Sequence, residues 1–216
     1  MAFAGEKRLA AEAAAELVEN GMVVGLGTGS TVAHLLPALA ARRLDVRCVA
    51  TSPATETAAR ALGLRVESFA GPAAPARLDI ALDGADQVGR NGWLVKGGGA
   101  AHTREKAVAA AADRFLVIVS SDKLVERLTP PIPLELLEYG LAATMWRLGS
   151  VALRDATRSP DGGVIADYTA LFDDSRQLAE RLSAEPGVVE HGLFPPELVS
   201  EIVVATGDSV EIRRIA

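Results

Sequence analysis

The chain has 216 residues and a formal net charge of −6, and 49% of its residues are hydrophobic. A chain of this length holds one large domain, with or without a small one. The acidic balance argues against a general nucleic-acid surface, which needs a basic patch, and the single cysteine, Cys48, excludes an intrachain disulfide. We expect a cytoplasmic protein without membrane contact, because we find neither a secretory leader nor an apolar run that could span a bilayer.

Strands and helices are predicted to alternate through the first half of the chain. Hydrophobic periodicity indicates helices over 6–20, 32–42, 53–62 and 100–112, and strands over 22–26, 46–50, 64–69, 78–82, 93–95 and 115–120. Such alternation is typical of parallel pairing with helices on both faces of a sheet. We therefore expect an α/β sheet of parallel strands with helices on both faces.

The pattern changes at Thr129–Pro133, where three prolines in four positions mark a boundary. Beyond them we predict a helix over 134–148, strands over 151–157 and 163–167, a helix over 175–182 and a strand over 188–193. This order fits a small α+β domain of ferredoxin-like type. Two short strands, over 202–205 and 209–212, are expected to return to the first sheet. The predicted domains are 1–128 with 203–216, and 129–202.

A glycine-rich turn, Gly25–Thr31, joins a predicted strand to a predicted helix. Its amides and its three hydroxyl groups, on Thr28, Ser30 and Thr31, suit a phosphate. A Walker A loop is excluded because no lysine follows Gly29, and the third glycine of a dinucleotide fingerprint is missing. The three hydroxyls favour a monophosphate, and a plain tight turn with a helix cap is the alternative.

Two carboxylates, Asp83 and Asp86, follow the strand predicted over 78–82. Ligands of open α/β sheets bind at the carboxyl ends of the strands. The pair could hold sugar hydroxyls, share a proton or bind a metal. We expect no metal site, because no histidine or cysteine cluster accompanies the pair. A capping turn is the alternative.

The segment Lys96–Lys106 carries the strongest chemical signal of the chain. Three consecutive glycines, 97–99, leave backbone amides open at the start of a predicted helix, next to the Lys96 ammonium group. Glu105 lies about one helical turn further on. A carboxylate, a cation and amides at one place indicate proton transfer next to a carbonyl. Lys123, which follows the strand over 115–120, is a candidate for binding a substrate anion, with a solvated surface lysine as the alternative.

Other polar residues carry weaker signals. Lys7 on the first helix is more often solvated, although it too could reach a phosphate. We read His34 as helix packing and His191 as a surface residue, and we assign His102 no role. Cys48 lies in an apolar run and is expected to be buried rather than nucleophilic.

These segments together resemble ribose-5-phosphate isomerase of type A, in one register over essentially the whole chain. The matching segments are 24–31, 83–86, 96–101, 103–106, 131–135, 186–189 and 192–194. The triglycine with its Thr-Arg-Glu-Lys tail is the most specific of them. The resemblance implies interconversion of D-ribose 5-phosphate and D-ribulose 5-phosphate in the non-oxidative pentose phosphate pathway. It also implies a Rossmann-like, mostly parallel domain with a smaller, lid-like α+β domain. It further implies no metal or organic cofactor and a homodimer or homotetramer.

The resemblance also implies a role for each matched residue. Glu105 would be the base that moves a proton between C1 and C2, and Asp83, Asp86 and Lys96 would handle ring opening and the enediolate oxygens. The implied substrate contacts are Thr28, Gly29, Ser30, Thr31, Asp83, Gly84, Ala85, Asp86, Lys96, Gly97, Gly98, Gly99 and Lys123. Departures from the family pattern occur at Gln87, His102 and the predicted hairpin 159–163.

Two other functions remain open. A non-catalytic regulator that binds a sugar phosphate would keep the same pocket, although it has no use for a positioned base. A protein resembling CoA transferases would use a glutamate as nucleophile on a related fold layout.

Overall fold

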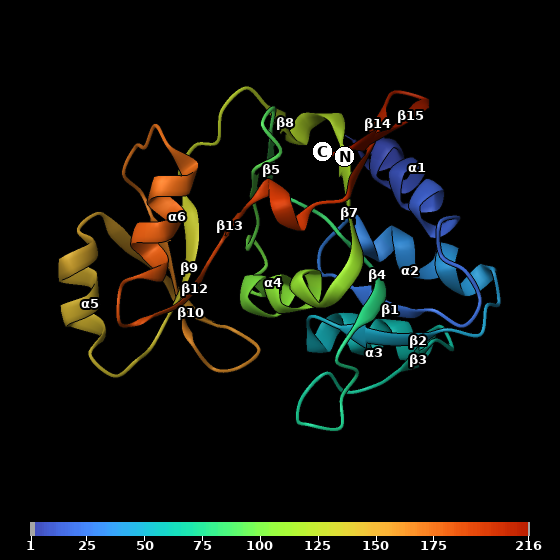
Figure 1. Cartoon of the computed structure of the whole chain (residues 1–216), viewed down its shortest axis with the longest axis horizontal. Helices are drawn as coiled ribbons and strands as arrows, with labels where there is room; N and C mark the ends of the chain where they lie inside the picture. The colour runs from blue at the N-terminus through green and yellow to red at the C-terminus, as the bar shows by residue number, and fades with distance from the viewer. Residues whose placement is uncertain (1–2, 216) are drawn as a thin grey trace. The chain divides into compact units, whose positions relative to one another are not determined.

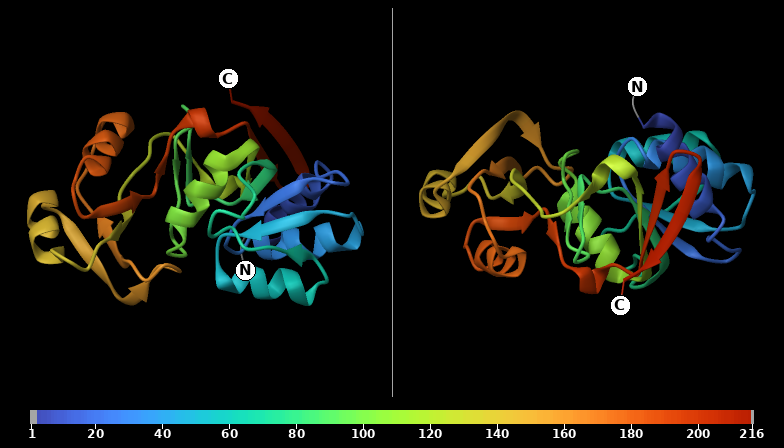
Figure 2. Two further views of the ribbon diagram at one scale, coloured as in Figure 1. Left: turned by 60° about the horizontal axis from the view of Figure 1, so that its bottom comes forward. Right: turned by 90° about the horizontal axis from the view of Figure 1, so that it is seen from above.

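The computed structural model of the chain describes residues 3–215, without the side chains of residues 156 and 157. The chain folds into two compact units (Figures 1 and 2). The first comprises Met1–Ala85, Arg104–Leu124 and Glu197–Ala216, and the second comprises Asp86–Thr103 and Val125–Pro196.

The first unit holds a seven-stranded sheet of order β15-β14-β7-β4-β1-β2-β3. Its strands are β1 (Val23–Leu26), β2 (Arg47–Ala50), β3 (Arg65–Val66), β4 (Leu78–Asp83), β7 (Ala112–Ser120), β14 (Glu201–Thr206) and β15 (Ser209–Arg214). Every pairing is parallel except the antiparallel pair of β14 and β15. The predicted mostly parallel sheet is therefore confirmed, as is the return of the last two strands to it.

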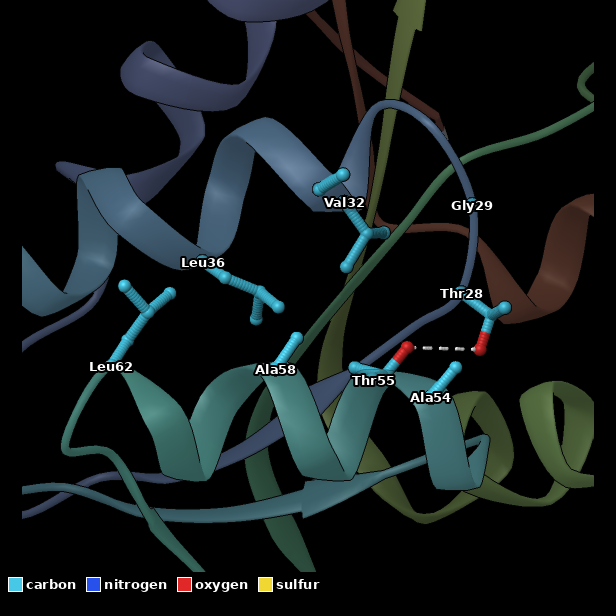
Figure 3. Close-up of a pocket in the computed structure, with 9 residues that line it drawn as sticks. Thr28, Gly29, Val32, Leu36, Ala54, Thr55, Ala58 and Leu62 are labelled. Carbon is cyan, nitrogen blue, oxygen red and sulfur yellow. Dashed lines mark hydrogen bonds between the residues drawn. The ribbon is translucent and has the colours of Figure 1, made fainter.

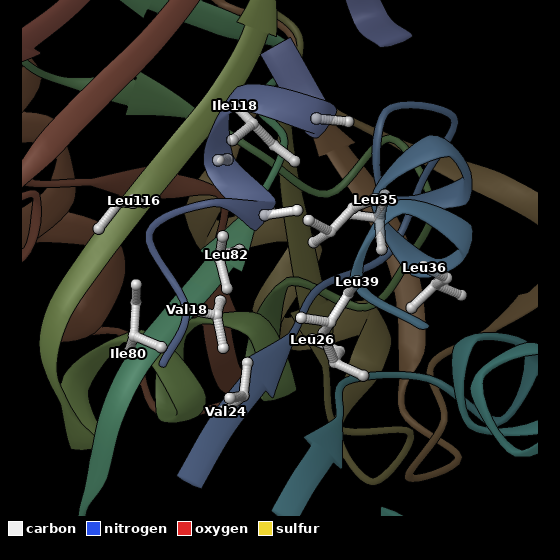
Figure 4. Close-up of a cluster of buried hydrophobic side chains, with 14 of the residues drawn as sticks. Val18, Val24, Leu26, Leu35, Leu36, Leu39, Ile80, Leu82, Leu116 and Ile118 are labelled. Carbon is white, nitrogen blue, oxygen red and sulfur yellow. The ribbon is translucent and has the colours of Figure 1, made fainter. Parts of the chain in front are cut away.

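Helices cover both faces of this sheet. They are α1 (Ala4–Ala15), α2 (Val32–Ala41), α3 (Pro53–Ala61) and α4 (His102–Ala111). Side chains of β1 and β4 alternate: Leu26 and Leu82 join the core that α1 and α2 cover (Figure 4), whereas Gly25 faces Val108 of α4. A Cβ on Gly25 would lie 2.5 Å from Val108 Cγ1, so this glycine lets α4 approach the sheet closely.

The second unit contains a four-stranded antiparallel sheet of order β10-β11-β9-β12. Its elements, in chain order, are β9 (Ile132–Leu136), α5 (Leu141–Leu148), β10 (Val151–Arg158), β11 (Val164–Tyr168), α6 (Ser175–Ser183) and β12 (Val188–His191). The succession βαββαβ is the ferredoxin-like order that the sequence predicted in part.

The predicted helix over 134–148 is wrong over its first seven residues, 134–140, of which the first three belong to strand β9. Ile132, Leu134 and Leu136 are buried in the core of the second unit, with the period of two that a strand requires, and the helix begins only after Gly140. Pro133 belongs to this strand. Because a proline within an apolar run argues against a strand, it hid the alternation of Ile132, Leu134 and Leu136 in the sequence. In β9 the Pro133 carbonyl accepts the Gly192 amide.

A second small sheet in this unit has the order β13-β6-β5-β8. Its strands are β5 (Gln87–Gly89), β6 (Leu94–Val95), β8 (Leu124–Val125) and β13 (Leu193–Phe194), and short 3-10 turns η1 (Ser121–Lys123) and η2 (Pro196–Leu198) complete the chain. Because β5 and β6 pair with each other and β6 pairs with β13, residues 86–103 group with the second unit. The sequence prediction had assigned them to the first domain, and its boundaries stay a prediction.

Candidate active site

The predicted site residues fall into two groups, one in each compact unit. Thr28–Thr31, Asp83, Glu105 and Lys123 belong to the first unit. Asp86, Lys96 and the three glycines belong to the second. Each group is built by the local structure of its own unit.

Asp83 is a buried carboxylate of the first group, and main-chain amides hold it in place. It ends β4 and is 3% exposed, and its Oδ1 accepts the amides of Thr28 (3.1 Å) and Gly84 (2.7 Å). A Cβ on Gly27 would lie 1.9 Å from the Asp83 carboxyl carbon. The glycine-rich turn thus closes over this side chain, which places a carboxylate at the carboxyl ends of β1 and β4.

The side-chain hydroxyl of Thr28 contacts two other threonine hydroxyls. Its Oγ1 lies 2.8 Å from Thr51 Oγ1. It also lies 3.3 Å from Thr55 Oγ1, and this contact is the dashed line in Figure 3. An apolar cavity of about 240 Å³ adjoins these hydroxyls between α2 and α3, with Val32 and Leu36 among the residues that line it. Apolar walls offer no charge to a phosphate. The candidates for binding an anion are therefore the residues of the turn that do not line this cavity, Ser30 and Thr31.

Lys7 contacts the exposed end of the turn, and Lys123 pairs with the neighbouring residue Asp122. Lys7 Nζ on α1 donates to Ser30 Oγ at 3.0 Å, and Lys123 Nζ lies 3.2 Å from an Asp122 carboxylate oxygen. Burial raises the pKa of Asp122, but hydrogen bonds from Ser120 and Lys123 and the charges of Lys123 and Lys7 hold it below its ordinary value. The charges of both lysines therefore act on the Asp122 carboxylate. The sequence prediction left Lys7 outside the site, because nothing local connects α1 with the turn.

Glu6 holds the start of α1 beside η1. Its Oε2 accepts the amide (2.8 Å) and the hydroxyl (2.7 Å) of Ser121, and its Oε1 accepts the amide of Gly207 (2.9 Å). These hydrogen bonds lower the pKa of Glu6, and the bond from the Gly207 amide has the largest effect on it. The anchored helix end explains how Lys7, the next residue, reaches the turn.

Glu105 lies in the first turn of α4 and is 4% exposed. Val108, one turn later on the same helix face, packs against Gly25 of β1. A helix that leads into a parallel strand starts near the carboxyl ends of its neighbours, so Glu105 belongs to the edge of the sheet at which Asp83 lies. A buried carboxylate in this position is suited to accept a proton.

Lys96 directly follows β6 and is 3% exposed. Its amide donates to the Gly192 carbonyl at 2.9 Å, and its Nζ lies 5.5 Å from the ring centroid of the buried Phe194. A cation over an aromatic face is stabilised by the ring quadrupole. The ammonium group thus has a defined position, as an electrophile requires.

The triglycine forms a turn that Asp86 anchors. The Ala100 amide donates to the Gly97 carbonyl at 3.0 Å, and the Gly98 amide donates to Asp86 Oδ2 at 2.7 Å. Gly97 has φ +108°, a conformation that glycine adopts without strain. The structure therefore brings Asp86 and the triglycine together through a direct hydrogen bond.

The three departures from the family pattern have structural partners. Gln87 donates to the Thr129 carbonyl and accepts its amide, both at 2.9 Å. His102 is fully buried, with its Nε2 3.4 Å from the Glu190 carbonyl. In the hairpin, the Ser159 hydroxyl donates to Glu135 and accepts the Gly163 amide.

The surface position expected for His191 is wrong, because this side chain is only 4% exposed. Its Nδ1 accepts the Leu193 amide at 3.2 Å, and its Nε2 lies 3.0 Å from the Ser183 hydroxyl. With Nδ1 as acceptor, a neutral ring carries its proton on Nε2 and donates it to the serine. The pair is therefore structural and not a nucleophile with its base.

Metal-binding clusters and membrane-spanning helices are both absent from residues 3–215. Within this range, no group of three or more histidine, cysteine or acidic side chains could hold a metal ion. None of the helices in the same range has the length and apolar character needed to cross a membrane.

Fold and site together define an α/β protein with buried carboxylates and a hydroxyl-rich turn at the carboxyl edge of a parallel sheet. Residues 47–209 match the family model of ribose 5-phosphate isomerase A, also called phosphoriboisomerase A. The chain belongs to this family.

Relatives extend the match to nearly the full length. Ribose-5-phosphate isomerase A of Halobacterium salinarum is 45% identical, over 97% of this chain and 96% of its own. The crystal structure of ribose 5-phosphate isomerase A from Neisseria gonorrhoeae superposes with a TM-score of 0.91 at 29% identity, over 97% and 96% of the two chains. A D-ribose-5-phosphate isomerase in complex with phospho-erythronic acid superposes with a TM-score of 0.89 at 30% identity, over 96% and 97%.

Proposed function

We propose that this chain is a ribose-5-phosphate isomerase, which interconverts D-ribose 5-phosphate and D-ribulose 5-phosphate in the non-oxidative pentose phosphate pathway. The observation that carries the proposal is the buried Glu105 in the first turn of α4, within the most specific family segment. The similar protein in complex with phospho-erythronic acid, a phosphorylated sugar acid, supports a sugar phosphate as ligand.

Glu105 is the proposed base of the reaction. In the open-chain aldose it takes the proton from C2, and the electrons of that C–H bond form the enediolate. A proton also moves from the C2 hydroxyl to O1, and the proton held by Glu105 then returns to C1, which gives the ketose. A positioned base of this kind contributes about 100- to 10,000-fold to the rate.

Asp83, Asp86 and Lys96 are proposed to open the sugar ring and to handle the oxygens of the enediolate. The Lys96 ammonium group stabilises the developing negative charge, helped by the amides of the triglycine turn. Asp83, whose first oxygen is held by two amides, is proposed to meet a sugar hydroxyl with its second. We propose no metal or organic cofactor, because an enediolate needs only these charges.

The phosphate is proposed to bind at Ser30 and Thr31 with Lys123, and with the main-chain groups of the same turn. Lys7 joins this group because its ammonium already lies 3.0 Å from Ser30 Oγ. Two cations and several hydroxyls in one place suit a dianion. The remaining proposed contacts are the side chain of Thr28 and the backbone positions Gly29, Gly84, Ala85 and Gly97–Gly99.

A cytoplasmic location and a homodimeric or homotetrameric state, the latter implied by the resemblance, belong to the same proposal. Large exposed side chains such as Tyr139 (95%) and Trp146 (83%) in the second unit support a further contact surface. Light scattering of the purified chain measures the assembly directly.

Substitution of Glu105→Gln tests the activity. We expect kcat to fall about 100- to 10,000-fold, with a small effect on KM, because the base is lost while the phosphate contacts remain. Glu56→Gln is the matched control, since Glu56 also lies in the first turn of a helix but pairs with Arg60 at the surface.

A near-normal rate in Glu105→Gln would contradict the proposal. Wild-type protein that binds ribose 5-phosphate without forming ribulose 5-phosphate would instead indicate a regulator. A covalent thioester at a glutamate after incubation with an acyl-CoA would indicate a transferase.

A further inference from the structure

Arg154 of β10 is an arginine of the second unit that lies outside the motifs on which the sequence resemblance was recognised. Its Nε and Nη2 donate to the two carboxylate oxygens of Asp167 on β11, at 2.8 and 2.7 Å. Both side chains are about four-fifths buried, with 21% and 18% of their surfaces exposed. A bidentate pair of this kind fixes the plane of the guanidinium group.

The remaining guanidinium nitrogen contacts the triglycine turn. Arg154 Nη1 donates to the Gly97 carbonyl at 2.9 Å and lies 3.3 Å from the Gly98 carbonyl. The bond to Asp167, and after it the charges of Asp167 and Asp86, raise the pKa of Arg154 above its ordinary value. The turn therefore has a permanent cation on its carbonyl side.

The peptide group between Gly97 and Gly98 is held from both sides. Its carbonyl accepts from Arg154, and its N–H donates to Asp86 Oδ2 at 2.7 Å. In a trans peptide these two groups point in opposite directions, so the two contacts set the orientation of the whole plane. The second contact of Arg154, to the Gly98 carbonyl, turns the Gly99 amide away from the arginine in the same way.

Glycines need such external contacts more than other residues do. Without a Cβ, a peptide between two glycines rotates among several orientations at little energetic cost. An electrostatic donor accelerates a reaction only when it is oriented before the charge develops. A turn of three glycines is thus a useful set of donors only if another part of the protein holds it.

We propose that Arg154, fixed by Asp167, is a positioning residue that works with Asp86 to hold the triglycine turn with the Gly99 amide directed to the substrate oxygens. This inference rests on the proposed isomerase function. It gives Asp86 a second task, since one of its oxygens orients the turn. Arg154 itself acts through the glycines.

Kinetics of full-length Arg154→Met and Asp167→Asn test the proposal. We expect kcat for ribose 5-phosphate to fall about 10- to 100-fold in Arg154→Met, since a misplacement of about 1 Å costs about 100-fold. KM should change less than about threefold, because the proposed phosphate contacts are elsewhere. Arg154→Lys should restore only part of kcat, because an ammonium group cannot bind Asp167 in a bidentate manner and reach the turn as well.

The control is Arg158→Met on the same strand, which removes a surface pair with Glu138. A kcat of Arg154→Met within twofold of this control would overturn the proposal. A loss of kcat that only follows the unfolded fraction in a thermal melt would also overturn it. If Arg154→Met does not fold, Asp167→Asn decides, because it keeps the size of the side chain but replaces one acceptor oxygen by an NH2 donor and so breaks the bidentate pair.

Amide hydrogen exchange separates this proposal from the proposed function. We expect the Gly98 amide to exchange at least about tenfold faster in Arg154→Met than in the wild type and in Arg158→Met. This readout requires no activity. A wild-type chain without isomerase activity would refute the proposed function. Unchanged exchange of the Gly98 amide in Arg154→Met would refute only the proposal that Arg154 holds the triglycine turn.

Discussion

Gly27 shows at the scale of one residue what the absence of a side chain makes possible. Its place in a glycine-rich turn suggested a cradle for phosphate. In the structure the missing side chain makes room for Asp83, whose carboxyl carbon would lie 1.9 Å from a Cβ at this position. The turn and Asp83 therefore pack directly against each other, and the groups that we propose for the phosphate begin at Ser30.

Cys48 allows a prediction about a single thiol. It is fully buried on β2, and burial, with a smaller effect of the Glu67 charge, raises its pKa to about 12. The thiolate is the reactive form, and at about pH 8 fewer than about one thiol in a thousand is ionised. We expect no reaction with a chromogenic disulfide in the native protein and one equivalent per chain in guanidinium chloride.

The matched control for this labelling is Ala110→Cys, which places a thiol at an exposed position of α4. That variant should release one equivalent at once without denaturant. Native wild-type protein that reacted as fast as the control would show that Cys48 is accessible.

Helix α1 shows how a single side chain, that of Glu6, fixes the position of an element. Glu6 joins its first turn to η1 and to the turn between β14 and β15, through Ser121 and Gly207. The neighbouring Lys7 reaches Ser30 from this anchored end. An element that is remote in sequence from the glycine-rich turn thereby supplies one of its cations.

We predict that Glu6→Gln lowers the melting temperature at neutral pH but not at acid pH. The folded-state pKa of Glu6 lies below its unfolded value. Its stabilising contribution is therefore complete above the unfolded-state pKa and is lost as the pH falls through the folded-state pKa. The difference in melting temperature between wild type and variant should be largest near neutral pH and should vanish in acid, below the folded-state pKa.

Glu12→Gln is the control on the same helix, because Glu12 forms an exposed pair with Arg8. Its effect on the melting temperature at neutral pH should be smaller than that of Glu6→Gln. A Glu6→Gln variant with the melting temperature of wild type at every pH would contradict the assigned contacts.

The whole molecule depends on segments from both ends of the chain. In the first unit, β14 lies between β15 and β7, in parallel register from Glu201 with Leu116 to Ala205 with Ser120. The C-terminal segment thus completes a sheet that the first half of the chain begins. Neither half contains all the strands of this sheet.

Truncation after Pro196 should therefore prevent folding. It removes Ile202, Val203 and Val204, each at most 3% exposed. Burial of such side chains contributes about 1.5–3 kcal/mol each, against about 5–15 kcal/mol for a whole domain. It also leaves β7 as an open edge that favours aggregation. We expect insoluble protein, or soluble protein without a cooperative thermal transition in circular dichroism.

Truncation after Thr206 is the matched comparison, because it removes only the exposed strand β15 and the turn before it. This shorter deletion should leave a folded protein with a lower melting temperature. A cooperative transition in the chain that ends at Pro196 would show that β14 is dispensable.

The sequence by itself determined what depends on local spacing. Three such features are short segments: the glycine-rich turn, the aspartates at and just after the end of β4, and the lysine–triglycine segment. Turn chemistry identifies them, and hydrophobic periodicity identifies the alternation of strands and helices. The family resemblance followed from the same segments. These features were enough for the fold class and the family.

Only the tertiary structure decided which distant groups meet. It paired β6 with β5 and with β13, placed Lys7 beside Ser30, and set Arg154 against the Gly97 carbonyl. It also made a strand of Ile132–Leu136, whose three alternating apolar residues are too few to outweigh the neighbouring prolines as a local signal. Pairing and packing depend on partners far away in the chain, and no local pattern encodes which partner wins.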